Sequence, residues 1–358
     1  MLDTIRAKVE DRRSISPAEA GWLFTHADDA VLQELATRVK SRFNPVDEAT
    51  YLIMAIVNYT NVCVARCDYC SFYRFPGDAD TYHLSTDEVC ERIDALKELG
   101  GQLVGFNGGF HPDLRVQDYI DLFTEVRRRY PNLEFYEMTV AEFMFVTKRT
   151  RLSYAESARQ FAAAGTRWIT GGGAEILTNS FRMRHSPGKY EAEDYYAAQR
   201  AILEAGMGST ATMVIGFDET LEERLEHLDT LRRFQAETGA RMPSFLCWTY
   251  KPWHNDLGGD EISTEEYLRW LAVSRIFLDN IPHIRASVLT QNERALEGLR
   301  FGADDFDLPT EDEVTQKAGA TVSHEFDRIL AAAPEGIDCR QREPWPVWTE
   351  ARDMAAEG

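Results

Sequence analysis

Three cysteines in one short segment constrain this chain more than any other feature of its sequence. Cys63, Cys67 and Cys70 follow one another at spacing C-x3-C-x2-C, directly after an apolar run at 52–57. Thiolates clustered in this way bind zinc or an iron–sulfur cluster. A closed zinc site requires four ligands, and the nearest histidine, His83, lies 13 residues after Cys70. Three thiolates on one loop suit three irons of a cubane cluster whose fourth iron stays open. Structural zinc and three buried structural cysteines are the alternatives.

Composition limits the class of protein around this cluster. The chain has 358 residues, a net charge of -20 and six cysteines. Because half of these cysteines lie together, we expect no disulfide framework and a reducing, cytoplasmic compartment. The first residues lack the apolar core of a signal peptide, and no apolar run reaches the length of a membrane span, so we expect no membrane partner. The acidic balance argues against a nucleic-acid partner, since affinity for a phosphate backbone comes from Lys and Arg.

Apolar, β-prone runs alternate with helix-length segments from residue 51 onward. Several of these segments begin with a capping box, as at 85–88 and 153–156. The alternation predicts an α/β fold with a parallel sheet, and eight units predict a closed (β/α)8 barrel of the TIM type. An open, partial barrel of six units is the alternative. The predicted strands lie at 52–57, 103–106, 133–139, 167–170, 210–215, 244–250, 284–289 and 299–301.

The chain is predicted to divide into three parts. Residues 1–48 form an N-terminal helical extension, which is broken at Asn44-Pro45. Residues 49–310 form the barrel. Residues 311–358 form a C-terminal helical tail packed on the barrel, with a helix near 323–333.

Polar and glycine residues follow the predicted strands, where barrel enzymes gather their active sites. Gly108 and Gly109 follow the second strand, and they either let the backbone approach a ligand or make a tight turn. Glu175 follows the fourth strand, where it accepts hydrogen bonds from a ligand or favours a helix N-terminus. A structural role is the alternative for His111 and a solvated one for Arg182. The residues that we expect to contact substrate are Thr139, Glu142, His111, Arg182 and Thr290.

The cysteine spacing, with Tyr69 directly before the last cysteine, resembles the C-x3-C-x-aromatic-C signature of the radical S-adenosylmethionine (SAM) superfamily. This resemblance implies a [4Fe–4S] cluster held by the three cysteines, with SAM bound to the open iron. It also implies that the glycine pair binds the methionine amino group of SAM and that Glu175 accepts hydrogen bonds from its ribose or amino group. Tyr69 is expected to lie along the adenine, with plain packing as the alternative.

Longer stretches resemble one family within this superfamily, the dehypoxanthine futalosine cyclases of menaquinone biosynthesis. The resemblance implies that a 5′-deoxyadenosyl radical removes a ribose hydrogen from dehypoxanthine futalosine and that the sugar radical then closes onto the benzoate ring. The Phe-Tyr-Arg sequence after the last cysteine favours this family over aminofutalosine synthases and FO synthase-like enzymes. The matching stretches are 58–63, 70–74, 108–112, 171–177, 211–213, 219–220, 235–239 and 302–306.

The match to the family pattern has gaps. Residues 55–57 read Ala-Ile-Val where the family tends to carry Arg-Asn-Ile, Phe110 replaces a frequent histidine, and 305–309 lacks the usual glycine. A diverged paralogue with another aromatic or nucleoside substrate is therefore an alternative. A non-catalytic metal-binding protein is a more distant one.

The implied reaction requires two partners. A low-potential electron donor such as flavodoxin or ferredoxin would reduce the cluster. The small-molecule substrate carries a carboxylate, so an Arg, a Lys or a backbone donor should face the barrel lumen. Arg74 and Arg182 are the candidates that the sequence offers.

Overall fold

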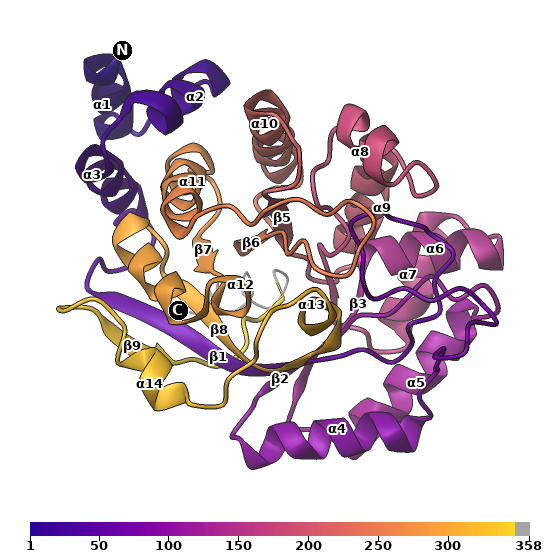
Figure 1. Ribbon diagram of the computed structural model, residues 1–358. Helices are drawn as coiled ribbons and strands as arrows, with labels where there is room; N and C mark the ends of the chain where they lie inside the picture. Colours follow the sequence, from indigo (N-terminus) through magenta and orange to yellow (C-terminus); the bar gives the residue numbers. More distant parts are fainter. Residues whose placement is uncertain (348–358) are drawn as a thin grey trace.

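Eight parallel strands stand side by side around a lumen, with helices outside them (Figure 1). The structure is a computed structural model, and it describes residues 1–347. The strand order is β4-β3-β2-β1-β8-β7-β6-β5. The predicted α/β barrel is therefore confirmed. The strands are β1 (Glu48–Val57), β2 (Leu103–Phe106), β3 (Glu134–Thr139), β4 (Trp168–Thr170), β5 (Ala211–Ile215), β6 (Ser244–Thr249), β7 (His283–Ala286) and β8 (Asp305–Asp312).

The helices between strands begin where local capping chemistry predicts them. The side chains of Ser85 and Ser153 each accept a hydrogen bond from the backbone N–H three residues later. The glutamate at that position in turn accepts a hydrogen bond from the backbone N–H of the serine. Such reciprocal bonds satisfy donors that a helix N-terminus leaves free. The helices are α4 (Thr86–Glu98), α5 (Val116–Arg129), α6 (Val140–Thr150), α7 (Tyr154–Ala163), α8 (Asn179–His185), α9 (Ala192–Glu204), α10 (Leu221–Glu237), α11 (Thr264–Phe277), α12 (Val288–Gln291), η1 (Asn292–Phe301), α13 (Glu313–Lys317) and α14 (Phe326–Leu330).

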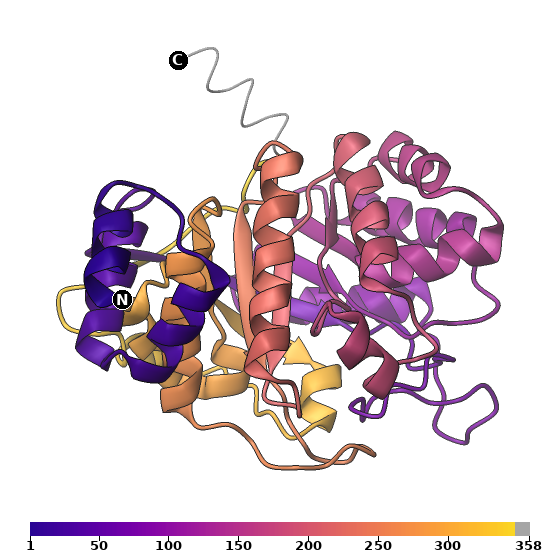
Figure 2. The same ribbon diagram turned by 90° about the horizontal axis from the view of Figure 1, so that it is seen from above.

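The N-terminal residues form three helices, α1 (Leu2–Glu10), α2 (Pro17–His26) and α3 (Asp29–Lys40). They pack on the outside of the barrel, where α2 and α3 contact α11 and α2 also contacts α10 (Figures 1 and 2). Arg269 of α11 pairs with Asp29 at 2.6 Å across this contact. The helices lie away from the lumen, so they support the barrel wall; the division of the chain at residues 48 and 310 stays a prediction.

The barrel is nearly closed, with a seam between β4 and β5. Only one isolated parallel bridge, Trp168 to Gly208, joins these two walls among residues 1–347. Side chains complete the seam, since Thr212 Oγ1 donates to Gly171 O at 2.5 Å and Gly171 N donates to Thr210 Oγ1 at 3.1 Å. The lumen is thus walled on all sides, and an open barrel of six units is excluded.

The prediction for strand eight is wrong. Residues 299–301 belong to η1, whose Leu296 and Leu299 are buried and which packs against α11. The strand is β8, which contains Asp305, Asp307 and Asp312 and therefore lacks an apolar pattern. Its aspartates are tolerated because arginines from other parts of the chain neutralise two of them inside the barrel.

The C-terminal tail lies across the N-terminal end of the barrel. After α14, which falls within the predicted helix at 323–333, the strand β9 (Asp338–Gln341) pairs with β1. Arg342 then binds Asp305 through both carboxylate oxygens, at 2.6 and 3.1 Å. Val347 joins a buried cluster of lumen-facing residues from the first four strands: Leu52, Met54, Leu103, Tyr136 and Trp168. We call this end of the lumen the floor. Residues 348–358 of the predicted tail lie outside the described part of the chain.

No helix in residues 1–347 has both the length and the apolar composition that a membrane span requires.

Candidate active site

One large cavity runs through the lumen. Its volume is about 350 Å³, and residues from all eight strands or from the loops that follow them line it. It extends from the loops at the C-terminal ends of the strands, which we call the mouth, down to Tyr136 and Arg285 at the floor. Thr139 and Thr290, two of the predicted substrate contacts, line this cavity. An enclosed site with few polar groups among apolar walls is typical of small-molecule pockets.

The three clustered cysteines meet at the mouth. Cys63 and Cys67 are buried, Cys70 is half-buried, and all three line the cavity. Backbone bonds hold the loop shape, since Cys63 N donates to Arg74 O at 2.9 Å and Arg74 N donates to Asn61 O at 2.8 Å. Burial raises the pKa of Cys63, and it raises that of Cys70 to about 12. Burial therefore disfavours the free thiolate at Cys63 and Cys70.

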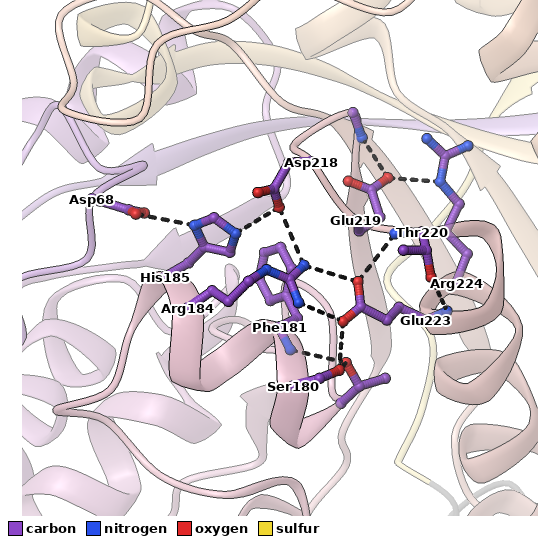
Figure 3. Close-up of polar contacts among 12 residues, drawn as sticks. Asp68, Ser180, Phe181, Arg184, His185, Asp218, Glu219, Thr220, Glu223 and Arg224 are labelled. Atoms are coloured by element: carbon purple, nitrogen blue, oxygen red, sulfur yellow. Dashed lines mark hydrogen bonds and ion pairs between the residues drawn. The ribbon is translucent and has the colours of Figure 1, made fainter.

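A network of carboxylates and basic side chains ties this loop to α8 and α10 (Figure 3). Asp68, directly after Cys67, faces Nδ1 of the buried His185 at 3.0 Å, and Nε2 of the same ring faces Asp218 at 2.6 Å. Arg184 then bridges Asp218 to Glu223, at 3.2 and 2.8 Å. The loop is therefore held by side chains as well as by backbone bonds, which keeps the thiols in place.

The glycine pair packs directly under the cysteine loop. A Cβ atom at Gly109 would lie 2.2 Å from Val62 O and 2.8 Å from Cys63 Cβ, and one at Gly108 would lie 2.7 Å from the Tyr59 ring. No side chain fits at either position without moving the loop. Both glycines line the cavity, so their absent side chains leave room for the cysteine loop and for a ligand.

Glu142 does not line the cavity, and its contact with substrate stays a prediction. Its side chain is fully buried, where it accepts hydrogen bonds from the Tyr59 hydroxyl, from Gly108 N at 2.9 Å and from Thr139 at 3.0 and 2.6 Å. Burial raises its pKa to about 7 despite these bonds. Glu142 forms the capping box of α6 with Thr139, and it positions the backbone of the glycine pair.

His111 and Arg182 also lie outside the cavity lining, and their contact with substrate stays a prediction. His111 Nδ1 accepts from Asp113 N at 3.2 Å in a turn, and its ring lies 5.3 Å from that of His83. Arg182 is almost fully buried behind the mouth, where its Nη1 contacts Glu175 at 3.4 Å and its guanidinium lies over the Tyr190 ring. In this structure both side chains contact other residues of the protein.

An acid–base cluster faces the cavity next to the thiols. Glu175 adopts a left-handed backbone conformation, with φ of 41°, and accepts from Lys189 at 3.2 Å as well as from Arg182. Burial alone would raise the pKa of Glu175, but Lys189 and Arg182 lower it. Lys189 Nζ also lies 3.3 Å from the Tyr69 hydroxyl. Strained backbone at a cavity wall, held by ion pairs, is typical of a functional site.

Comparisons with known proteins show which family this site belongs to. The family model for the radical SAM superfamily matches residues 57–231, and the model for the CofH/MqnC C-terminal region matches residues 244–343. A cyclic dehypoxanthine futalosine synthase from Streptomyces coelicolor is 35% identical over 88% of this chain and 80% of its own length. Another, from Halalkalibacterium halodurans, is 32% identical over 92% of this chain and 90% of its own.

The chain belongs to the radical SAM superfamily. An aminodeoxyfutalosine synthase from Thermus thermophilus is 33% identical over 93% of the chain and 92% of its own length. The crystal structure of methylornithine synthase shares the fold, with a TM-score of 0.71 at 14% identity over 98% of this chain and 99% of that one. Members of this superfamily use a [4Fe–4S] cluster and SAM.

The mouth of this radical SAM protein fits these two cofactors. No three Cys, His, Asp or Glu side chains within residues 1–347 are grouped to hold a single metal ion. A zinc site needs its ligands to converge on one atom, whereas a cubane takes each thiolate on a different iron. The glycine pair and Glu175 provide backbone room and a carboxylate beside the thiols, which suit the amino and hydroxyl groups of SAM.

Two cavity residues escaped sequence reasoning. Lys189 stands in a Pro-Gly-Lys-Tyr turn, which predicts a turn but no chemistry. Arg285 is one polar residue in the strand β7 and gives no local signal either. The only clue in the sequence was the need for a cation facing the lumen, and the two candidates named for it, Arg74 and Arg182, do not line the cavity. Arg74 pairs with Asp80 and with loop carbonyls, and Arg182 lies behind the mouth.

Proposed function

We propose that this protein cyclises dehypoxanthine futalosine to cyclic dehypoxanthine futalosine in menaquinone biosynthesis. The observation that carries this proposal is the arrangement of one cavity, with three thiols, the glycine pair and Glu175 at its mouth and a separate polar floor at its other end. Such a cavity can hold two molecules in line. The two relatives named cyclic dehypoxanthine futalosine synthase, which match most of the chain, support this substrate.

The residues of the mouth would hold the cofactors. Cys63, Cys67 and Cys70 would bind the cluster, which would supply the electron for reductive cleavage of bound SAM. Glu175 would accept hydrogen bonds from SAM, because Lys189 and Arg182 keep it ionised. Tyr69 would lie along the adenine, since its ring is already packed among Phe181 and Phe217.

The lumen would orient the substrate and exclude water. Thr139 and Thr290 place their side chains at the cavity wall. Orientation matters because a displacement of about 1 Å between reacting atoms can cost roughly a hundredfold in rate. Enclosure matters because a radical that escapes to solvent or reductant is lost without product.

The test uses anaerobically reconstituted protein with SAM, a reductant and dehypoxanthine futalosine. Mass spectrometry should detect the cyclic product together with 5′-deoxyadenosine. The Cys67→Ala protein, treated in the same way, serves as the control for chemistry caused by free iron. Cleavage of SAM without cyclic product in the native protein would reject this substrate.

The Thermus relative named aminodeoxyfutalosine synthase makes that activity the second candidate. The Phe72-Tyr73-Arg74 sequence favours the cyclase. Running the same assay with the substrates of an aminodeoxyfutalosine synthase separates the two activities.

We also propose a low-potential protein such as flavodoxin or ferredoxin as the electron donor, and a cytoplasmic location without a nucleic-acid partner. The net charge of -20 supports the last point, since binding to a phosphate backbone requires Lys and Arg. Comparing product yield with flavodoxin, ferredoxin and a chemical reductant tests the donor.

A further inference from the structure

The floor of the lumen presents hydrogen-bond donors that have no protein acceptor among residues 1–347. Arg285 uses Nε to bind Asp305 at 2.7 Å and Nη2 to bind Asp307, while Nη1 has no partner. Ser244 Oγ is buried and without a partner. Tyr136 adds a hydroxyl, and burial raises its pKa to about 12, so it stays protonated. All three residues line the cavity.

These donors come from different strands but lie at one level of the barrel. Ser244 on β6 is paired with His283, two residues before Arg285 on β7. Tyr136 on β3 lies across the lumen, close enough for Arg285 to act on its hydroxyl electrostatically. Of these donors, Ser244 Oγ is the one that is fully buried without a partner, and buried donors are nearly always paired in native proteins, because an unpaired one loses its hydrogen bonds to water. An acceptor at the floor would therefore satisfy Ser244 and could also bind Arg285 and Tyr136, which line the same cavity.

The other cations of the cavity are engaged or exposed. Lys189 pairs with Glu175 at the mouth, and Lys251 pairs with Glu261 at 2.6 Å. Arg66 is exposed and lies over the Phe75 ring. Arg285 is also paired, with Asp305 and Asp307, but its Nη1 makes no hydrogen bond within residues 1–347, and it is the cation that lines the cavity at the floor.

Charges around Arg285 are balanced by the C-terminal tail. Arg342 holds Asp305 from below through two hydrogen bonds, so Asp305 is shared between two arginines and its pKa falls to about 2 despite burial. Trp345 covers the Arg342 guanidinium at 3.5 Å. Asp307 is the remaining carboxyl, and burial raises its pKa. A carboxyl of this kind can take a proton when a second carboxylate arrives beside it.

We infer that Arg285, Tyr136 and Ser244 bind the carboxylate of the substrate at the floor of the lumen. This inference rests on the proposed function, in which the substrate is a benzoate joined to a ribose. With its carboxylate at the floor, the substrate extends towards the mouth, and its ribose lies at the end that faces the thiols. Charge-assisted bonds from Arg to carboxylate are short and directional, so this anchor sets the distance of the ribose from the mouth.

The experiment measures binding to the reconstituted holoenzyme with SAM, anaerobically and without reductant. Isothermal titration compares dehypoxanthine futalosine with its carboxamide analogue, which keeps the shape but lacks the charge. We expect the native protein to bind the carboxylate about ten- to a hundredfold more tightly than the amide. Tyr136→Phe and Ser244→Ala should each weaken carboxylate binding severalfold and leave amide binding unchanged, and Arg285→Lys should abolish the preference.

Matched controls exist for the two mild variants. Tyr196 and Ser157 carry buried hydroxyls without partners and do not line the cavity, so Tyr196→Phe and Ser157→Ala should change neither affinity. Equal affinity of the native protein for carboxylate and amide, or unchanged binding in Tyr136→Phe and Ser244→Ala, would overturn the inference. If that result came from a protein that still makes the cyclic product, the proposed function would stand while the anchor would be wrong.

Discussion

The mouth and the floor of the barrel hold their polar groups in different ways. At the mouth, thiols, glycines and an ion-paired glutamate sit on loops, and the cysteine loop is tied to its neighbours by backbone bonds and by the Asp68–His185–Asp218 contacts. At the floor, single side chains project from separate strands, and the tail closes them from below through Arg342. The two ends can therefore be perturbed separately. Substitutions at the mouth should change cofactor binding, and substitutions at the floor should change substrate binding.

The largest expected effect is at the mouth. Cys67→Ala should abolish both the cluster and product formation, because losing one thiolate destabilises a cubane. Iron content and the visible absorption band measure this. Cys90 is a buried cysteine on α4 that does not line the cavity, so Cys90→Ala is the matched control. Loss of iron in Cys90→Ala with retention in Cys67→Ala would reverse the assignment of ligands.

The next effect is at the floor. Arg342→Ala leaves buried Asp305 with one arginine fewer, and breaking a buried ion pair of this kind costs about 3–5 kcal/mol in the free energy of unfolding. Iron content and SAM affinity should stay unchanged, while product per SAM cleaved falls. Urea unfolding and the product ratio are the measurements, with Arg340→Ala, which removes an exposed pair with Asp338, as control. A drop in iron content in Arg342→Ala would show that the two ends are not separate.

A smaller effect is expected from the glycine pair. Gly109→Ala places a Cβ atom against Val62 O, and overpacking of this kind costs about 1–3 kcal/mol. Because the clash pushes on the cysteine loop, SAM affinity should fall while affinity for the substrate carboxylate at the floor is kept. Gly21→Ala meets only the flexible end of Leu225 at 3.1 Å and should change neither. Normal SAM affinity in the Gly109→Ala protein would show that the glycine pair takes no part in binding SAM.

The smallest effect concerns the cap that supports the glycines. Thr139→Ala removes a capping hydroxyl worth about 1 kcal/mol and loosens Glu142, which holds Gly108 N. SAM affinity should fall severalfold, measured by equilibrium binding. Ser153→Ala removes an equivalent cap from α7 on the exposed surface, and it should lower stability by a similar amount without changing SAM affinity. Equal SAM affinities for the two variants would show that Glu142 does not support the SAM-binding site.

Sequence reasoning reached the mouth because its signals are local. The cysteine spacing, the glycine pair and Glu175 each stand next to a strand end, and the capping boxes that mark the helices lie within four residues. The same logic did not foresee that Glu142 and Arg182 are buried behind the cavity lining, since residue spacing does not tell whether a polar side chain faces a ligand or a buried partner.

The floor could not be predicted from the sequence, because its residues are far apart in the chain. Asp305 and Asp307 made β8 look unlike a strand, and the arginines that neutralise them, Arg285 and Arg342, are up to 37 residues away. The apolar residues of η1 looked more like a strand but pack against α11. Only the closed barrel shows that these charges meet, which is why a lumen-facing cation was expected but Arg285 was not among the candidates.

In this protein, the mouth would hold the cofactors beside a ribose whose far end is anchored at the floor. The most direct test gives the reconstituted protein dehypoxanthine futalosine that carries deuterium at the abstracted ribose position, and then analyses the 5′-deoxyadenosine by mass spectrometry. The account predicts deuterium in the 5′-deoxyadenosine of the native protein, together with the cyclic product, and a lower product per SAM cleaved in the Arg285→Lys protein. 5′-Deoxyadenosine without deuterium, formed at the same rate whether or not the substrate is present, would contradict it.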